Sequence, residues 1–136
     1  MNIEQRAEKG AQLKKSGACN CCQAVAAALA DQTGLSEEAL MQIASGFGAG
    51  MGNMEATCGA LVGAVQMAGL ALEGKNTVRT ARALSEVFAQ RCGAVRCRDL
   101  KGKGTGAPLC ACEDCVRNAI LAYGELVGLK DTEPSA

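Results

Sequence analysis

Residues 56–72 read ATCGALVGAVQMAGLAL, a run of 17 residues without a charged side chain. The run is near the lower limit of ~20 residues for a membrane-spanning helix. It contains Gln66 and lacks flanking basic anchors, so we expect a buried central helix and no membrane span. Its small residues form two adjoining stripes, which predict close packing against other helices. The stripes are Ala60, Ala64 and Ala68, and Gly59 and Gly63.

The rest of the chain also shows helical patterns, and no stretch alternates as a strand does. Asn20 and Ser36 are placed to cap helices, and Asn76 or Thr77 is placed to cap another. We expect helices over about 3–16, 21–33, 37–45, 55–72, 77–90 and 112–127. Four glycines within Gly46–Gly52 predict a loop. The predicted fold class is therefore all-α, a compact bundle of about five to six helices with a glycine-rich loop.

Length and charge limit the possible functions. A chain of 136 residues predicts one cysteine-rich helical domain over 1–136, with its core at about 17–127. Fourteen basic and fourteen acidic residues balance, so nucleic-acid binding is not expected. No apolar stretch follows a basic segment at the N-terminus, so we expect a cytoplasmic protein with reduced thiols. The alanine and glycine stripes could also pack between chains, which makes a homodimer an open expectation.

The chain has nine cysteines and no histidine. Without imidazole there is no Ser-His or Cys-His nucleophile pair, so the chemistry is expected to rest on sulfur. The cysteines fall at predicted helix starts in three of four groups, and helix N-termini stabilise thiolates. The groups are Cys19, Cys21 and Cys22; Cys58; Cys97; and Cys110, Cys112 and Cys115. Cys92 lies outside them, and we interpret it as a small buried hydrophobe.

Spacing alone leaves several functions open. Cys19-x-x-Cys22 and Cys112-x-x-Cys115 resemble the two halves of a structural zinc site, but 89 residues separate them. Either pair could instead be a redox dithiol. The glycine loop could let the chain wrap closely around a cluster, or could only let two helices cross tightly. A zinc-stabilised interaction module and a metal-free thiol–disulfide oxidoreductase or redox sensor therefore remain alternatives.

Four segments in order resemble the C_GCAxxG_C_C family of redox-active proteins. They are residues 20–25 (NCCQAV), 45–52 (SGFGAGMG), 58–63 (CGALVG) and 97–100 (CRDL), and the resemblance covers about 17–127. It implies a small helical protein with a sulfur-based redox or metal role. A related domain in split-Soret cytochromes lies next to a non-haem iron centre, which favours an iron–sulfur cluster, although the haem part has no counterpart here.

The resemblance also implies a set of ligands. The family's four cysteines correspond to Cys21, Cys58, Cys97 and Cys112, with Cys115 competing for the last place. Four thiolates suffice for a [2Fe–2S] cluster. We therefore expect a protein that binds an iron–sulfur cluster and transfers electrons to an unidentified redox partner. The extra cysteines, which are Cys19, Cys22, Cys92 and Cys110, could serve a second metal, a resolving thiol or neither.

Overall fold

The computed structural model describes residues 1–130, and within them the chain forms seven α-helices and no β-strand. The helices are α1 (Ile3–Lys15), α2 (Cys21–Leu29), α3 (Glu37–Ala44), α4 (Gly59–Ala71), α5 (Thr77–Cys92), α6 (Cys97–Leu100) and α7 (Cys112–Leu126). The predicted all-α fold is confirmed. Six of the described helices have eight or more residues, and α6 is a single turn.

Local side-chain bonds explain where several helices begin. Asn20 caps α2 as predicted: its side chain accepts from the backbone N–H of Gln23, whose own side chain accepts from Asn20. The Ser36 hydroxyl caps α3 by accepting from Ala39 at 3.1 Å. Asn76 does precede α5, but it adopts a left-handed conformation (φ 57°) and makes no side-chain capping bond. The predicted cap there is correct in position only.

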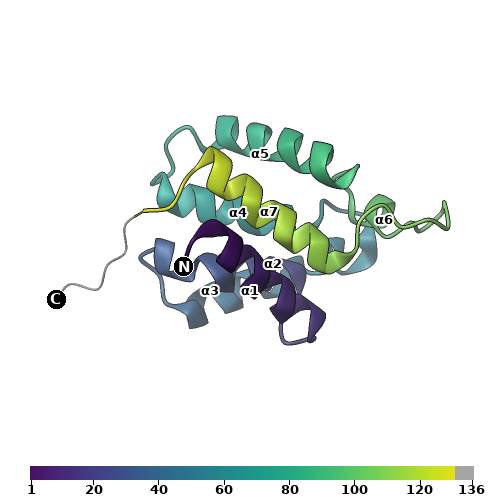
Figure 1. Ribbon diagram of the computed structural model, residues 1–136, viewed down its shortest axis with the longest axis horizontal. Helices are drawn as coiled ribbons and strands as arrows, with labels where there is room; N and C mark the ends of the chain where they lie inside the picture. Colours follow the sequence, from purple (N-terminus) through teal and green to yellow (C-terminus); the bar gives the residue numbers. More distant parts are fainter. Residues whose placement is uncertain (131–136) are drawn as a thin grey trace.

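The helices pack around α7, which crosses the middle of the molecule between α5 and α1 (Figure 1). Behind it, α2 packs against α4, and both also contact α7. Phe88 and Tyr123 are fully buried here, and most of the remaining core consists of alanine, valine, leucine and cysteine. Because small side chains fill so much of the core, the helices lie close together.

A close helix approach involves the small-residue stripes of α4. A Cβ built on Gly63 would lie 3.0 Å from the carbonyl oxygen of Cys22 and 3.1 Å from the Cβ of Val25, both on α2. The predicted close packing is confirmed, and it places the start of α4 beside the start of α2.

The α4 helix begins at Gly59, four residues later than predicted. The preceding segment instead pairs with the chain before α6. The backbone N–H of Cys58 donates to the carbonyl of Val95 at 2.7 Å, and that of Cys97 donates to Ala56 at 3.0 Å. This long-range pairing occupies backbone groups that a local helical pattern would have used, so sequence periodicity could not reveal it.

Other boundaries differ slightly from expectation. α2 ends at Leu29 and continues as a 3-10 turn over Ala30–Gln32, whereas the glycine-rich loop includes a 3-10 turn over Ser45–Phe47 and a π turn over Gly50–Met54.

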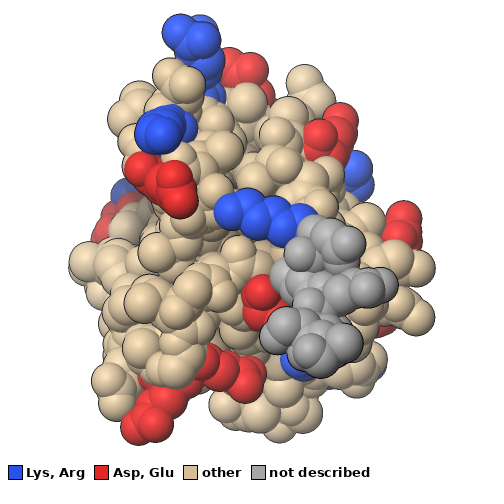
Figure 2. Space-filling view, turned by 90° about the vertical axis from the view of Figure 1, so that its left-hand side faces the viewer, with Lys and Arg blue, Asp and Glu red and all other residues tan. Residues whose placement is uncertain are grey.

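No described helix is both long and apolar enough to cross a membrane. On the face shown in Figure 2, basic and acidic side chains are interspersed, as the balanced charge leads one to expect.

Candidate metal and redox centre

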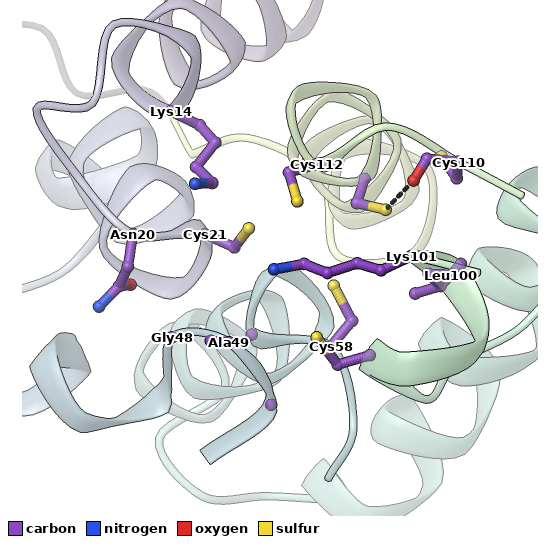
Figure 3. A pocket seen from close by; sticks show the side chains of 14 residues that line it. Lys14, Asn20, Cys21, Gly48, Ala49, Cys58, Leu100, Lys101, Cys110 and Cys112 are labelled. Atoms are coloured by element: carbon purple, nitrogen blue, oxygen red, sulfur yellow. Dashed lines mark hydrogen bonds between the residues drawn. The ribbon is translucent and has the colours of Figure 1, made fainter. Parts of the chain in front are cut away.

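A cavity of about 160 Å³ lies where several helices begin (Figure 3). Its walls combine cysteine sulfurs, glycine backbone and two lysines. They are formed by Lys14, Asn20, Cys21, Gly48, Ala49, Gly50, Cys58, Gly59, Cys97, Leu100, Lys101, Cys110, Cys112 and Cys115. All five cysteines that the sequence predicts as ligands therefore line one cavity, although they are as far apart in the chain as residues 21 and 115.

Four of these cysteines occupy equivalent positions on four different helices. Cys21, Cys97 and Cys112 are the first residues of α2, α6 and α7, and Cys58 is the N-cap of α4. Free backbone N–H groups and the helix dipole favour negative charge at such positions. Helix starts thus favour the thiolate, the form of cysteine that binds metals and attacks disulfides, but burial and neighbouring sulfurs outweigh this effect at Cys21, Cys97 and Cys112 and raise their pKa values.

The glycine-rich loop forms one wall of the cavity because its glycines allow close contact. A Cβ on Gly50 (φ 56°) would lie 2.6 Å from the Cβ of Cys97, and one on Gly48 would lie 2.7 Å from the Cβ of Asn20. Gly63 meanwhile lets α4 cross α2 tightly. The α4 glycine brings two helices together, and the loop glycine Gly50 brings backbone against Cys97.

Cys58 is the centre of the hydrogen bonding in the cavity. Its sulfur contacts the thiols of Cys115 and Cys21 and accepts from the backbone N–H groups of Ala60 and Leu61. These bonds outweigh burial and lower the pKa of Cys58 to about 4. For Cys21, the contact with Cys112 lowers the pKa, but the bond to Cys58 and burial prevail and raise it to about 11.

A second group of sulfurs adjoins the cavity. The Sγ atoms of Cys92, Cys110 and Cys115 lie within 4.8 Å of one another. The Cys115 thiol donates to the carbonyl oxygen of Cys110 at 3.8 Å. Cys115 and Cys110 both contact Cys92, whose sulfur accepts from the Asn118 side chain at 3.4 Å. These contacts lower the pKa of Cys92 to about 6. Hydrogen bonding to Cys58 and Cys92 instead raises the pKa of Cys115.

Two lysines line the cavity: Lys14 from the end of α1, and Lys101 just after α6, whose side chain extends among the cysteine sulfurs (Figure 3). Lys101 favours the thiolate forms of Cys97 and Cys112, while burial raises the pKa of Cys97 and the bond with Cys21 raises that of Cys112. The two lysines can offset the negative charge of several thiolates and of an anionic group bound among them.

The structure does not bring together the cysteines of the zinc alternative. Cys19 and Cys22 do not line the cavity, and the Cys22 thiol donates to the side-chain oxygen of Gln66 at 3.2 Å instead. Cys19 precedes the cap of α2, so it lies outside the helix that directs Cys21. Consecutive helical residues point about 100° apart, which separates Cys22 from Cys21.

Sequence reasoning missed the role of Cys92. It is buried as expected, but its neighbours are sulfurs, so a purely hydrophobic role is not what the structure shows. Cys92 ends α5 and Cys110 precedes α7, and only tertiary packing makes them neighbours. The sequence signals for Cys92 were only that it lies outside all four groups and that the number of cysteines is odd.

Comparison with known proteins supports the resemblance seen in the sequence. The family model described as "Putative redox-active protein (C_GCAxxG_C_C)" matches residues 19–126. The chain belongs to this family. It has no significant match among curated proteins or among solved structures. The protein therefore belongs to a redox family, and its group of Cys92, Cys110 and Cys115 is able to bind a metal ion.

Proposed function

We propose that this C_GCAxxG_C_C protein holds an iron–sulfur cluster in the cavity and transfers single electrons between two partner proteins. The observation that carries the proposal is the convergence of four helix starts, each presenting one cysteine, on one cavity. The ligands would be Cys21, Cys58, Cys97 and Cys112. The cluster would supply a one-electron couple, and the protein would supply thiolates, backbone N–H groups and the nearby lysines.

The spacing of these sulfurs favours a cluster over a single metal ion. Tetrahedral zinc with bonds of about 2.3 Å needs ligand sulfurs about 3.8 Å apart. Within residues 1–130, no three of the four proposed ligands lie within 4.8 Å of one another. A cluster distributes its ligands over two or more iron atoms, so it tolerates wider separations.

The direct experiment is anaerobic purification followed by measurement of iron and acid-labile sulfide per chain. We expect similar amounts of both and a visible charge-transfer absorption. Cys58→Ala should lower the iron content about tenfold or more, because Cys58 contacts thiols on both neighbouring helices and accepts bonds from the start of α4. Cys22→Ala is the matched control, since Cys22 is equally buried, lies on α2 and does not line the cavity.

Two results would contradict the proposal. One is a wild-type protein that contains no iron after anaerobic purification and takes up none when iron and sulfide are supplied together. The other is an iron content that falls equally in Cys58→Ala and Cys22→Ala, because the loss would then follow from general destabilisation.

A metal-free dithiol is the second candidate, and one observation favours it. The low-pKa sulfur of Cys58 lies in hydrogen-bond contact with the thiols of Cys21 and Cys115. A thiolate beside a neutral thiol is the arrangement that forms a disulfide on oxidation. This function would give a colourless protein that loses thiols in pairs on mild oxidation, with the loss prevented by Cys58→Ala.

A further inference from the structure

We propose that Cys92, Cys110 and Cys115 form a second site, adjoining the cluster cavity, that binds one Zn²⁺ ion; Cys110 and Cys115 also line the cavity, whereas Cys92 does not. These residues come from the end of α5, the loop before α7 and the first turns of α7. Among residues 1–130 they are the one set of three potential ligands whose donor atoms all lie within 4.8 Å of one another. Separations below that limit are compatible with the ~3.8 Å between sulfurs on a single tetrahedral metal ion.

The fold holds all three residues from independent directions. The backbone N–H groups of Leu109 and Cys110 donate to the Leu100 carbonyl at 2.9 and 3.3 Å, which ties the loop to α6. Asn118, one turn after Cys115, donates to the Cys92 sulfur at 3.4 Å. Backbone and side-chain bonds within the chain therefore position the three sulfurs, which lowers the cost of ordering a site.

Charge and access favour a divalent thiophilic cation such as Zn²⁺ over Cu⁺. Three thiolates leave a net charge of −1 around Zn²⁺ but −2 around Cu⁺, and burying the larger charge costs more. Arg91 adjoins Cys92 and offsets the smaller charge, while the nearby Asp114 carboxylate is paired with Arg117. Cys92 and Cys115 are buried but Cys110 is half exposed, so water can supply the fourth ligand there.

This site also resolves the competition between Cys112 and Cys115. Cys115 contacts Cys58 on one side and both Cys92 and Cys110 on the other, and only the latter set has single-ion spacing. Cys112 instead contacts Cys21, within the cavity. The two sites are thus adjacent, with Cys115 between them.

Anaerobic elemental analysis of the full-length protein tests the proposal. The protein is incubated with one equivalent of Zn²⁺, desalted, and assayed for zinc, iron and sulfide. We expect one zinc per chain in wild type and in Cys22→Ala, and about tenfold less in Cys92→Ala. Because Cys92 does not line the cavity, iron and sulfide should be unchanged in Cys92→Ala.

The zinc result is independent of the cluster. If iron is absent everywhere but zinc depends on Cys92, the cluster proposal fails and the zinc site stands. Equal zinc in Cys92→Ala and Cys22→Ala, or a wild type that retains none, overturns the zinc site. If circular dichroism shows Cys92→Ala unfolded, Cys110→Ala replaces it, since Cys110 is in a loop and half exposed. Co²⁺ in place of Zn²⁺ should give thiolate charge-transfer absorption that Cys110→Ala abolishes.

Discussion

The α-carbon of Gly59 faces the carbonyl oxygen of Phe47 so closely that a Cβ built on Gly59 would lie 2.5 Å from that oxygen. The same Cβ would lie 3.3 Å from the backbone nitrogen of Cys22. Gly59 therefore holds the glycine-rich loop, the start of α2 and the start of α4 against one another. Because Cys58 precedes Gly59, this contact also sets the position of the central cavity sulfur.

The first prediction concerns that contact. Gly59→Ala should lower the free energy of unfolding by about 1–3 kcal/mol, because the clashing atom is backbone and cannot rotate away. Gly69→Ala is the matched control on the same helix: its Cβ would meet only the Thr77 methyl, at 3.6 Å. Higher helix propensity should then stabilise Gly69→Ala by up to about 1 kcal/mol. Urea unfolding measures both, and equal effects would contradict this account.

The buried Arg6 predicts a second stability difference. Its guanidinium pairs with both oxygens of Asp31 and donates to the Ala28 carbonyl at 3.0 Å, joining α1 to the end of α2. Asp31→Asn should lower the free energy of unfolding by about 1–3 kcal/mol, because a neutral amide then replaces the carboxylate that pairs with the buried guanidinium. Glu86→Gln is the control, since the Arg82–Glu86 pair is exposed and should be worth about 0.3–0.5 kcal/mol. Similar losses in both variants would refute the prediction.

The third prediction is a pH dependence at Tyr123. Its buried hydroxyl has no hydrogen-bond partner in the described part of the chain, and burial raises its pKa while Arg6 lowers it somewhat. The folded-state pKa lies above the unfolded value of about 10. The stability that comes from keeping the hydroxyl neutral is therefore fully present below pH 10 and is lost as the pH rises from 10 through the folded-state pKa. Tyr123→Phe should remove that alkaline loss and raise stability at pH 7 by about 1 kcal/mol.

The measurement at Tyr123 is direct because the chain has one tyrosine and no tryptophan. Comparison of wild type and Tyr123→Phe isolates phenolate absorption from that of thiolates. We expect phenolate to form at higher pH in the native protein than in urea. Ionisation at the same pH in both states would show that the hydroxyl is hydrated.

The fourth prediction rests on the proposed cluster. Lys101→Met removes a positive charge from the cavity wall, which should disfavour the added electron and lower the reduction potential by roughly 20–60 mV. Lys103→Met is the control, because Lys103 is exposed in the adjacent loop and does not line the cavity. Potentiometric titration of both variants checks this, and equal shifts would show a general charge effect.

The helical fold was accessible from the sequence because its signals are local. Asn20 and Ser36 cap helices by bonding three residues ahead, and the small-residue stripes of α4 follow from helical periodicity. Cys21 and Cys112 were placed at predicted helix starts for the same reason, and both do begin their helices, whereas the helix that begins at Cys97 was not predicted. Such features need only a few consecutive residues to be recognised.

The sequence by itself thus determined the all-α class, the main helices and a sulfur-based site. Only the tertiary structure decided which sulfurs are neighbours. Pairing of Cys58 with Val95 and of Cys97 with Ala56 shortened α4, and packing of α5 on α7 placed Cys92 beside Cys115. These contacts depend on the closing of long loops between segments, and no local pattern records which distant backbone or sulfur a residue will meet.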